Sequence, residues 1–152
     1  MRPSAACRPD VKCRLGAISK WLMALIAALP LYACQADLKA YRPQSMAEAE
    51  IRALLLQVQD AWNRRDTAAY AKLLHRHATF WLQQEMRIVD RKTYLKHLPQ
   101  EMQSHVQFGR PIIKLRAQKA FVDFNVTSEK GLRNTTFTLL KQDRRWWILA
   151  IR

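Results

Sequence analysis

The chain has 152 residues, of which 49% are hydrophobic, and its 26 Lys and Arg against 12 Asp and Glu give a net charge of +14. This length suits one domain with its own apolar core, and the absence of internal repeats and low-complexity segments excludes a repeat array. The basic residues are spread along the chain, which is typical of solvated faces.

The first predicted element is an apolar run from Trp21 to Ala33, which follows a basic stretch with five Lys or Arg and one Asp. Its 13 residues are too few to cross a bilayer, because a helix that spans the hydrocarbon needs roughly 20. A basic stretch, about 7 to 15 apolar residues and a small residue make up a secretory signal peptide. We therefore expect residues 1–33 to be a signal peptide, starting at Met1 or at Val11; a buried core helix is the alternative.

The end of the apolar run, Leu31-Tyr32-Ala33-Cys34, resembles the lipobox of bacterial lipoproteins. The resemblance implies that the Cys34 thiol takes a diacylglyceryl group, that residues 1–33 are cut off and that the new amine is acylated. An ordinary cleaved signal peptide is the alternative. Cys7 and Cys13 lie in the part that is removed, so the mature chain would have no free thiol and no disulfide.

Removal of residues 1–33 takes away five of the 26 basic and one of the 12 acidic residues, which leaves a net charge of +10. For an exported protein the nearest anions are phospholipid headgroups, lipopolysaccharide and the teichoic or peptidoglycan carboxylates. We expect a protein anchored to the membrane of the bacterial cell envelope by its N-terminal lipid. Its candidate partners are an anionic envelope polymer or a partner protein, and no nucleic acid. Gln35, which stands where lipoproteins retained at the inner membrane of enterobacteria have aspartate, favours the outer membrane, facing the periplasm.

Residues 34–44 show no periodicity and contain Pro43, so we expect a flexible, lipidated tether before a domain at residues 45–152. Ser45 and Glu48 have capping-box spacing and predict the start of a long amphipathic helix that ends near residue 63. Its apolar face has helical spacing and consists of Ile51, Leu54, Leu55, Val58 and Trp62.

Asp66 and Asp90 can each cap a further helix; the first of these is short, and the second is ended or kinked by Pro99. A strand is predicted at residues 78–82, and the second half of the chain changes to strand periodicity. The turns there are short enough for antiparallel hairpins. The four strands predicted in that half are residues 106–116, 120–128, 135–141 and 146–152.

The last predicted strand contains Trp146-Trp147-Ile148-Leu149-Ala150-Ile151, which is apolar on both faces. We expect Trp62 and Trp147 to join the first helix to this strand. The three predicted helices can cover only one face of the sheet, so either the even-numbered or the odd-numbered residues of this stretch lack a partner within the chain. Exposed apolar patches usually mark interfaces, and we expect a homodimer through the outer face of the sheet. The alternatives are cover by the tether or by another partner.

Two motifs, Ala61-Trp62-Asn63-Arg64-Arg65-Asp66 and Leu139-Leu140-Lys141 followed by Trp146-Trp147-Ile148, resemble those of the nuclear transport factor 2-like superfamily, which includes the SnoaL-like proteins. The resemblance covers residues 45–152. It implies an α+β fold in which a curved antiparallel sheet wraps on three N-terminal helices into a cone, the cystatin-like α+β roll, with a pocket at the open end. In this superfamily the outer sheet face often pairs two copies.

The superfamily holds isomerases, dehydratases, epoxide hydrolases and non-catalytic proteins, so the fold alone does not imply an activity. A ketosteroid-isomerase-like site needs a carboxylate base on the first strand and a proton donor opposite it. The stretch from Thr79 to Gln84 contains no acid, and the first helix contains no tyrosine. We expect a non-catalytic binding or accessory domain. The alternative is a SnoaL-like isomerase or hydrolase acting on a small apolar substrate.

The sequence predicts no catalytic residue, no cofactor and no metal site, since no two of its four histidines have the helical H-x-x-x-H spacing. Five residues are candidates for lining a ligand pocket. Each has a structural alternative, which is core packing for an aromatic residue and an outward polar position for the acid or the histidine. The candidates are Tyr70, Trp81, Tyr94, His97 and Asp123.

Overall fold

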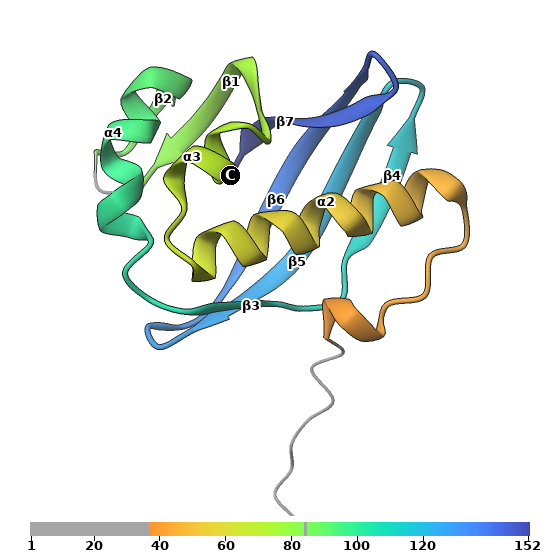
Figure 1. Cartoon of the computed structure of the whole chain (residues 1–152), viewed down its shortest axis with the longest axis horizontal. Helices are drawn as coiled ribbons and strands as arrows, with labels where there is room; N and C mark the ends of the chain where they lie inside the picture. The colour runs from red at the N-terminus through yellow and green to blue at the C-terminus, as the bar shows by residue number, and fades with distance from the viewer. Residues whose placement is uncertain (1–36, 84) are drawn as a thin grey trace, which may run out of the picture. The chain divides into compact units, whose positions relative to one another are not determined.

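The computed structural model describes residues 37–83 and 85–152. The expected signal peptide and Cys34 lie outside these residues. Within the two described ranges, no helix is long and apolar enough to cross a membrane. In the described residues, three α-helices lie on one side of a curved sheet of seven strands, so the predicted α+β fold class is confirmed (Figure 1).

The helices begin at the predicted caps. The side chains of Ser45, Asp66 and Asp90 accept hydrogen bonds from the backbone N–H three residues further on, at 3.2, 2.8 and 2.8 Å. Pro99 does not end its helix, which continues for two more residues. The elements are the 3₁₀ turn η1 (Leu38–Ala40), α2 (Met46–Asn63), α3 (Thr67–Ala71) and α4 (Arg91–Glu101).

The strands form a sheet in the order β2-β1-β7-β6-β5-β3, and β4 pairs with β5 as well. All pairs are antiparallel except β1 and β7, which run parallel, so the sheet is mixed and not purely antiparallel. Residues 83–144 lie between β1 and β7, so no tight hairpin forces these two strands into opposite directions. The strands are β1 (Leu74–Leu82), β2 (Arg87–Asp90), β3 (Val106–Phe108), β4 (Ile112–Arg116), β5 (Lys119–Ser128), β6 (Gly131–Gln142) and β7 (Arg145–Ile151).

Several strand boundaries differ from the prediction. Residues 106–116 form two strands, β3 and β4, with Gly109 between them. The Gly109 N–H donates to the carbonyl of Asn125 at 2.8 Å, and a Cβ on Gly109 would lie 3.3 Å from that oxygen. Strands β1 and β6 each begin four residues before the predicted strand, and β2 was not predicted. In β2 only Val89 is buried, so its four residues show no alternation that could reveal a strand.

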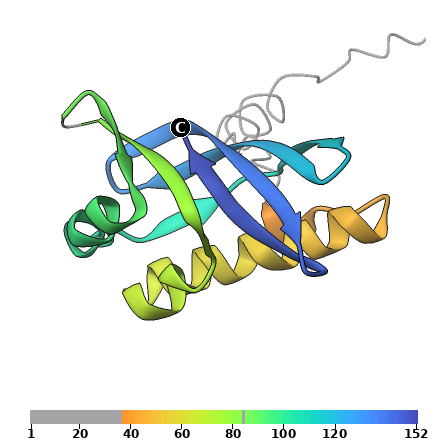
Figure 2. The same cartoon turned by 90° about the horizontal axis from the view of Figure 1, so that it is seen from above.

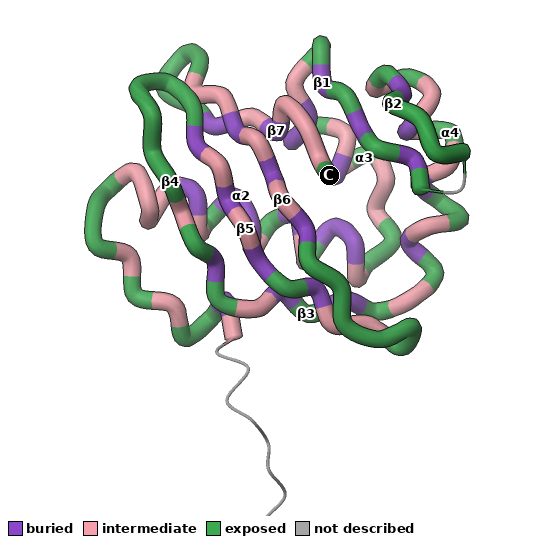
Figure 3. The backbone as a smooth tube through the Cα atoms, turned by 180° about the vertical axis from the view of Figure 1, so that it is seen from behind, coloured by how far each residue is buried: buried purple, intermediate pink, exposed green. Residues whose placement is uncertain are grey.

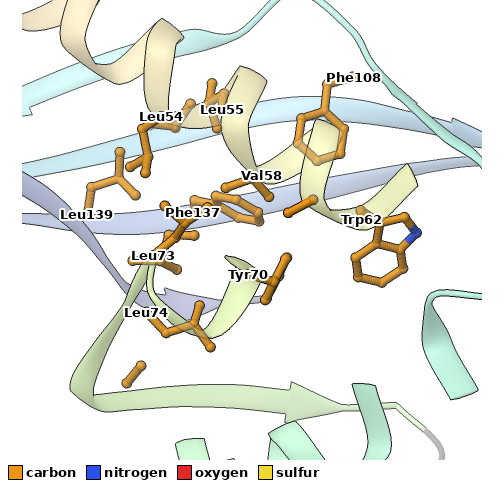
Figure 4. Close-up of a cluster of buried hydrophobic side chains, with 14 of the residues drawn as sticks. Leu54, Leu55, Val58, Trp62, Tyr70, Leu73, Leu74, Phe108, Phe137 and Leu139 are labelled. Atoms are coloured by element: carbon orange, nitrogen blue, oxygen red, sulfur yellow. The ribbon is translucent and has the colours of Figure 1, made fainter. Parts of the chain in front are cut away.

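The core lies between α2 and the inner face of the sheet, and Figure 2 shows α2 running along that face. The predicted apolar face of α2 is confirmed, because all five of its residues are buried. Leu55 and Val58 from α2 lie in one cluster with Tyr70 of α3 and with Phe137 and Leu139 of β6 (Figure 4).

A bulge in β7 changes which of its residues face the core. Leu139 of β6 pairs with Ile148, but Thr138 pairs with Ala150, so Leu149 is an extra residue in the ladder. Ile148 therefore faces the core before the bulge and Ile151 packs against the core after it. The sequence predicted that the even-numbered residues of this stretch share one face of the sheet and the odd-numbered residues the other. This prediction is wrong, because the bulge shifts the alternation by one residue.

The tryptophan that joins the last strand to the first helix is Trp146, and the prediction of Trp147 is wrong. Trp146 is buried, and its indole N–H donates to the carboxylate of Glu50 in α2 at 2.9 Å. Trp147 is half-buried on the outer face, where the Arg145 guanidinium lies 4.4 Å from its ring centre. A stretch that is apolar on both faces does not show which of two adjacent tryptophans points inward.

Residues 37–44 lie against the domain, so the predicted flexible tether is wrong for this segment. Leu38 is fully buried, and Asp37 forms an isolated bridge with Gly109. The Arg52 Nε of α2 donates to the carbonyl of Leu38 at 3.3 Å. The described part of the domain therefore begins at Asp37.

Glu48 takes part in holding this segment. Its carboxylate accepts from the Tyr41 hydroxyl at 2.6 Å and from the Gln44 N–H at 2.8 Å. The Gln44 bond, followed by the Tyr41 bond, lowers the pKa of Glu48 below its usual value. The predicted capping box is thus only half formed, because Glu48 bonds to the residue before Ser45.

Candidate functional site

An open cavity of about 380 Å³ lies between the helices and the sheet. Ligand pockets of proteins usually have volumes of about 300 to 1,000 Å³, so this cavity can hold a small molecule. Its lining comes from α2, α3, α4 and five strands of the sheet, β1, β3, β5, β6 and β7. The apolar wall includes Val58, Trp62, Tyr70, Phe80, Tyr94 and Phe137.

Aromatic contacts hold this wall in place. The rings of Phe80 and Tyr94 are stacked, with centres 3.9 Å apart and planes 5° from parallel. Trp62 meets Tyr70 edge to face at 5.9 Å, and its indole N–H donates to the carbonyl of Ser104 at 3.1 Å. Because these rings fix one another, the cavity wall is formed before any ligand arrives.

Two tyrosine hydroxyls provide the polar group of the wall. The hydroxyl oxygens of Tyr70 and Tyr94 are 3.4 Å apart and share a buried hydrogen bond. Burial raises the pKa of Tyr94 to about 12 and the pKa of Tyr70 well above its usual value. Both phenols therefore keep their protons at neutral pH. Since two hydroxyls share one hydrogen bond, one O–H remains that can donate to an oxygen of a ligand.

The mouth of the cavity is mostly basic. Lys130, Arg133 and Arg152 line it together with one acid, Glu101. Arg133 lies close enough to the two phenols to lower their pKa values, against the larger effect of burial. The buried Thr135 lies in the same lining.

Three of the five predicted pocket residues line this cavity. Tyr70 and Tyr94 form its wall, and Trp81 lies at its rim, where 44% of the residue is exposed. Their role in binding a ligand stays a prediction.

The other two candidates do not line the cavity. Asp123 lies on the outer face of β5, because Val122 and Phe124 on either side of it point to the core. Its carboxylate accepts from the Thr136 hydroxyl at 2.7 Å. His97 lies on α4 and faces Glu85, with Nε2 3.6 Å from the carboxylate. In the described part of the chain, no group of three His, Cys, Asp or Glu side chains is placed to hold a metal ion.

Sequence reasoning missed the residues that β6 contributes, which include Arg133, Thr135 and Phe137. The alternation of β6 shows that Thr135 and Phe137 share a face. It does not show that the curvature of the sheet brings the beginning of β6 towards α3 and α4. That arrangement depends on contacts between distant parts of the chain.

No protein-family model matches the chain, and no curated protein matches it significantly. Solved structures do match. A protein of unknown function with a cystatin-like fold from Nostoc punctiforme superposes with a TM-score of 0.61 at 10% identity, over 73% of this chain and 92% of that one. An NTF-2-like protein of unknown function from Shewanella oneidensis gives 0.60 at 20% identity, over 70% and 97%.

A proposed ketosteroid isomerase from Shewanella frigidimarina superposes with a TM-score of 0.58 at 16% identity, over 66% of this chain and 90% of that one. These similarities define the class of fold: the domain has the cystatin-like, NTF2-like α+β fold. At such low sequence identities the structural similarity shows the fold alone and does not show an activity.

Proposed function

We propose that the protein is a lipid-anchored component of the bacterial cell envelope, whose domain binds a small, largely apolar molecule without converting it. The observation that carries this proposal is the pair of buried, protonated tyrosines in an open aromatic cavity. Pockets of this kind hold the apolar body of a ligand by burial and orient it with a few polar groups.

The polar groups of the cavity define two features of the ligand. The O–H left over from the Tyr70 and Tyr94 pair favours a ligand with an acceptor oxygen at its buried end. At the mouth, the cations of Lys130, Arg133 and Arg152 outnumber the acid and favour a negative group on the ligand.

The anchoring part of the proposal is supported by the sequence alone. The lipobox-like residues before Cys34 follow a basic stretch and a short apolar run. A lipid on Cys34 would hold the ligand-binding domain at the membrane surface.

The test of ligand binding uses 8-anilinonaphthalene-1-sulfonate, a fluorescent molecule with an aromatic body and a negative group. A chain of residues 35–152 contains every residue of the described core and serves as the binding protein. We expect its addition to raise the emission of the probe. The Tyr70→Phe/Tyr94→Phe variant, which lacks both hydroxyls of the pair, should bind about five-fold more weakly, because a hydrogen bond contributes about 1 kcal/mol.

Tyr41→Phe is the matched control, since Tyr41 also donates a hydrogen bond but does not line the cavity. Its affinity for the probe should equal that of the unchanged domain. Equal affinity in the Tyr70→Phe/Tyr94→Phe variant, or no binding of the probe to the unchanged domain, would contradict the proposal.

One observation favours an enzyme as the second candidate. Glu101 lines the same cavity as the tyrosine pair, and enolisation of a ketone needs a base near the carbon and a donor near the oxygen. In that case the domain should catalyse exchange of deuterium from solvent into the carbon next to the carbonyl of cyclohexanone, and Glu101→Gln should abolish the exchange. If the domain does not raise the rate of deuterium exchange above that in buffer alone, the enzyme candidate is contradicted and the binding function is retained.

A further inference from the structure

Strand β4 forms an exposed edge of the sheet. Among the described strands it pairs only with β5, and four of its five residues are exposed (Figure 3). It combines exposed apolar and basic side chains: Ile112 and Leu115 are 62% and 42% exposed, while Lys114 and Arg116 are exposed as well.

The described part of the chain begins beside this edge. Asp37 forms its bridge with Gly109, which is followed directly by the exposed Arg110. The exposed Lys39 lies two residues after Asp37. We use the name β4 surface for the exposed residues Arg110, Ile112, Lys114, Leu115 and Arg116.

The β4 surface has more basic than acidic groups. Of its neighbouring acids, Asp37 accepts a hydrogen bond from the backbone N–H of Lys39 at 3.1 Å, and Asp123 lies 3.8 Å from Lys114 Nζ. Three cations on one exposed edge, Arg110, Lys114 and Arg116, next to the exposed aliphatic side chains of Ile112 and Leu115, are suited to a surface of anionic headgroups with apolar chains below.

The distance from the proposed lipid to the β4 surface is short. Only three peptide units join Cys34 to Asp37, so their Cα atoms are at most about 11 Å apart. Because residues 37–44 lie against the domain, this segment does not lengthen the connection between Cys34 and the domain. A lipid on Cys34 would therefore keep the beginning of the domain next to the headgroups.

We propose that the β4 surface lies against an anionic lipid bilayer and sets the orientation of the domain on the membrane. The distance argument rests on the proposed lipid attachment, whereas the charge argument does not. A second copy of the chain fits this edge less well, because two basic surfaces repel each other. In addition, Pro111 and two cations next to a short strand disfavour pairing with another strand.

The first test measures binding of the unlipidated chain of residues 35–152 to vesicles. The vesicles contain phosphatidylcholine with or without about one third phosphatidylglycerol, and bound protein is measured by flotation at low and high salt. We expect binding only to the anionic vesicles, and a loss of binding at high salt. The Arg110→Glu/Lys114→Glu variant should bind at least about five-fold less.

Lys92→Glu/Lys96→Glu is the matched control, because it changes the net charge equally but lies on α4. It should bind within about two-fold of the unchanged domain. Equal losses in both double variants would show that net charge alone drives binding and would overturn the proposal, as would the absence of binding at low salt.

The second test uses the full chain in its own membrane. The thiol of the Ile112→Cys variant should react more slowly with a membrane-impermeant maleimide than the thiol of the Lys92→Cys variant. Equal reactivity in the lipidated protein would overturn the proposed orientation. If palmitate labelling shows no lipid on Cys34, the lipid anchor fails; selective binding in the vesicle test would then still support the β4 surface, and no selective binding would overturn it.

Discussion

The side chain of Trp62 joins three parts of the domain. It extends from α2, contacts the ring of Tyr70 on α3 and donates a hydrogen bond to the carbonyl of Ser104 after α4. Only 7% of the residue is exposed, and its ring forms part of the cavity wall. Trp147 is the opposite case, since its half-buried ring lies on the outer face beneath the side chain of Arg145.

Replacement of these two tryptophans should therefore have different effects. Trp62→Ala should lower the free energy of unfolding by about 3 to 5 kcal/mol, the usual cost of truncating a buried aromatic side chain. Trp147→Ala should cost clearly less, because its ring loses fewer contacts. Urea unfolding of the two variants measures the difference, and equal losses would contradict the placement of the two rings.

In the proposed function, membrane attachment depends on Cys34. Cys34→Ala should leave the precursor uncut and remove palmitate labelling, because the thiol is the acceptor of the first lipid in the proposed processing. Single acyl chains bind membranes only marginally, while several chains anchor stably, so the variant should also leave the membrane fraction. Labelling of the variant with palmitate would show that another site carries the lipid.

At the scale of elements, the attachment of residues 37–44 to the domain depends on the carboxylate of Glu48. Glu48 accepts hydrogen bonds from Tyr41 and Gln44, and the Gln44 bond is the main cause of its lowered pKa. A lowered pKa in the folded state means that the stabilisation is present above the pKa of the unfolded chain. It is lost as the pH falls through the lowered value.

We therefore expect residues 37–44 to detach in acid while the rest of the domain stays folded. Hydrogen exchange should show protection of this segment at about pH 6 and less protection at about pH 3, after correction for intrinsic rates. Glu48→Gln should reduce the protection already at about pH 6. Glu129→Gln, at an exposed turn, is the control and should leave it unchanged. Full protection in Glu48→Gln would contradict this role of the carboxylate.

The sequence predicts those elements whose signals are local. The spacing of apolar residues and the caps at Ser45, Asp66 and Asp90 predict the three α-helices, because such signals lie within a few residues of each other. The attachment of Leu38 and the bulge at Leu149 could not be predicted in this way. Both depend on contacts with strands that are distant in sequence.

The residues of the candidate site also divide into those with a local signal in the sequence and those that depend on contacts between distant parts of the chain. Tyr70 and Tyr94 could be selected because aromatic residues follow the predicted caps, whereas Arg133 had no signal of its own. It reaches the cavity mouth because β6 begins four residues earlier than its apolar alternation suggests and because the sheet curves.

At the scale of the whole molecule, the outer face of the sheet remains the candidate surface for a homodimer. Leu140 of β6 and Trp147 of β7 are direct cross-strand neighbours there, and both are half-buried. Phe121 of β5 pairs with Thr138 on the same face. No described helix lies over this face of the sheet (Figure 3), and pairing of identical faces is the commonest closed arrangement.

We predict that the unlipidated domain has twice its monomer mass at tens of micromolar in light scattering. Leu140→Glu should shift it to the monomer, because the pairing would bury two charges. Leu115→Glu, on the β4 edge, should not change the mass. A monomer mass for the unchanged domain would show that this face does not pair two copies at that concentration.

The place of β7 in the sheet also has a consequence for how the chain folds. The last strand of the described chain lies between β1 and β6, so the β1–β2 hairpin has no link to the other strands until residues 145–151 have been synthesised. Pairings between such distant segments form slowly, because long loops must close first. Before that point neither the cavity nor the continuous core can exist. A chain that has been synthesised only as far as residue 144 therefore lacks the strand that joins the β1–β2 hairpin to the rest of the sheet.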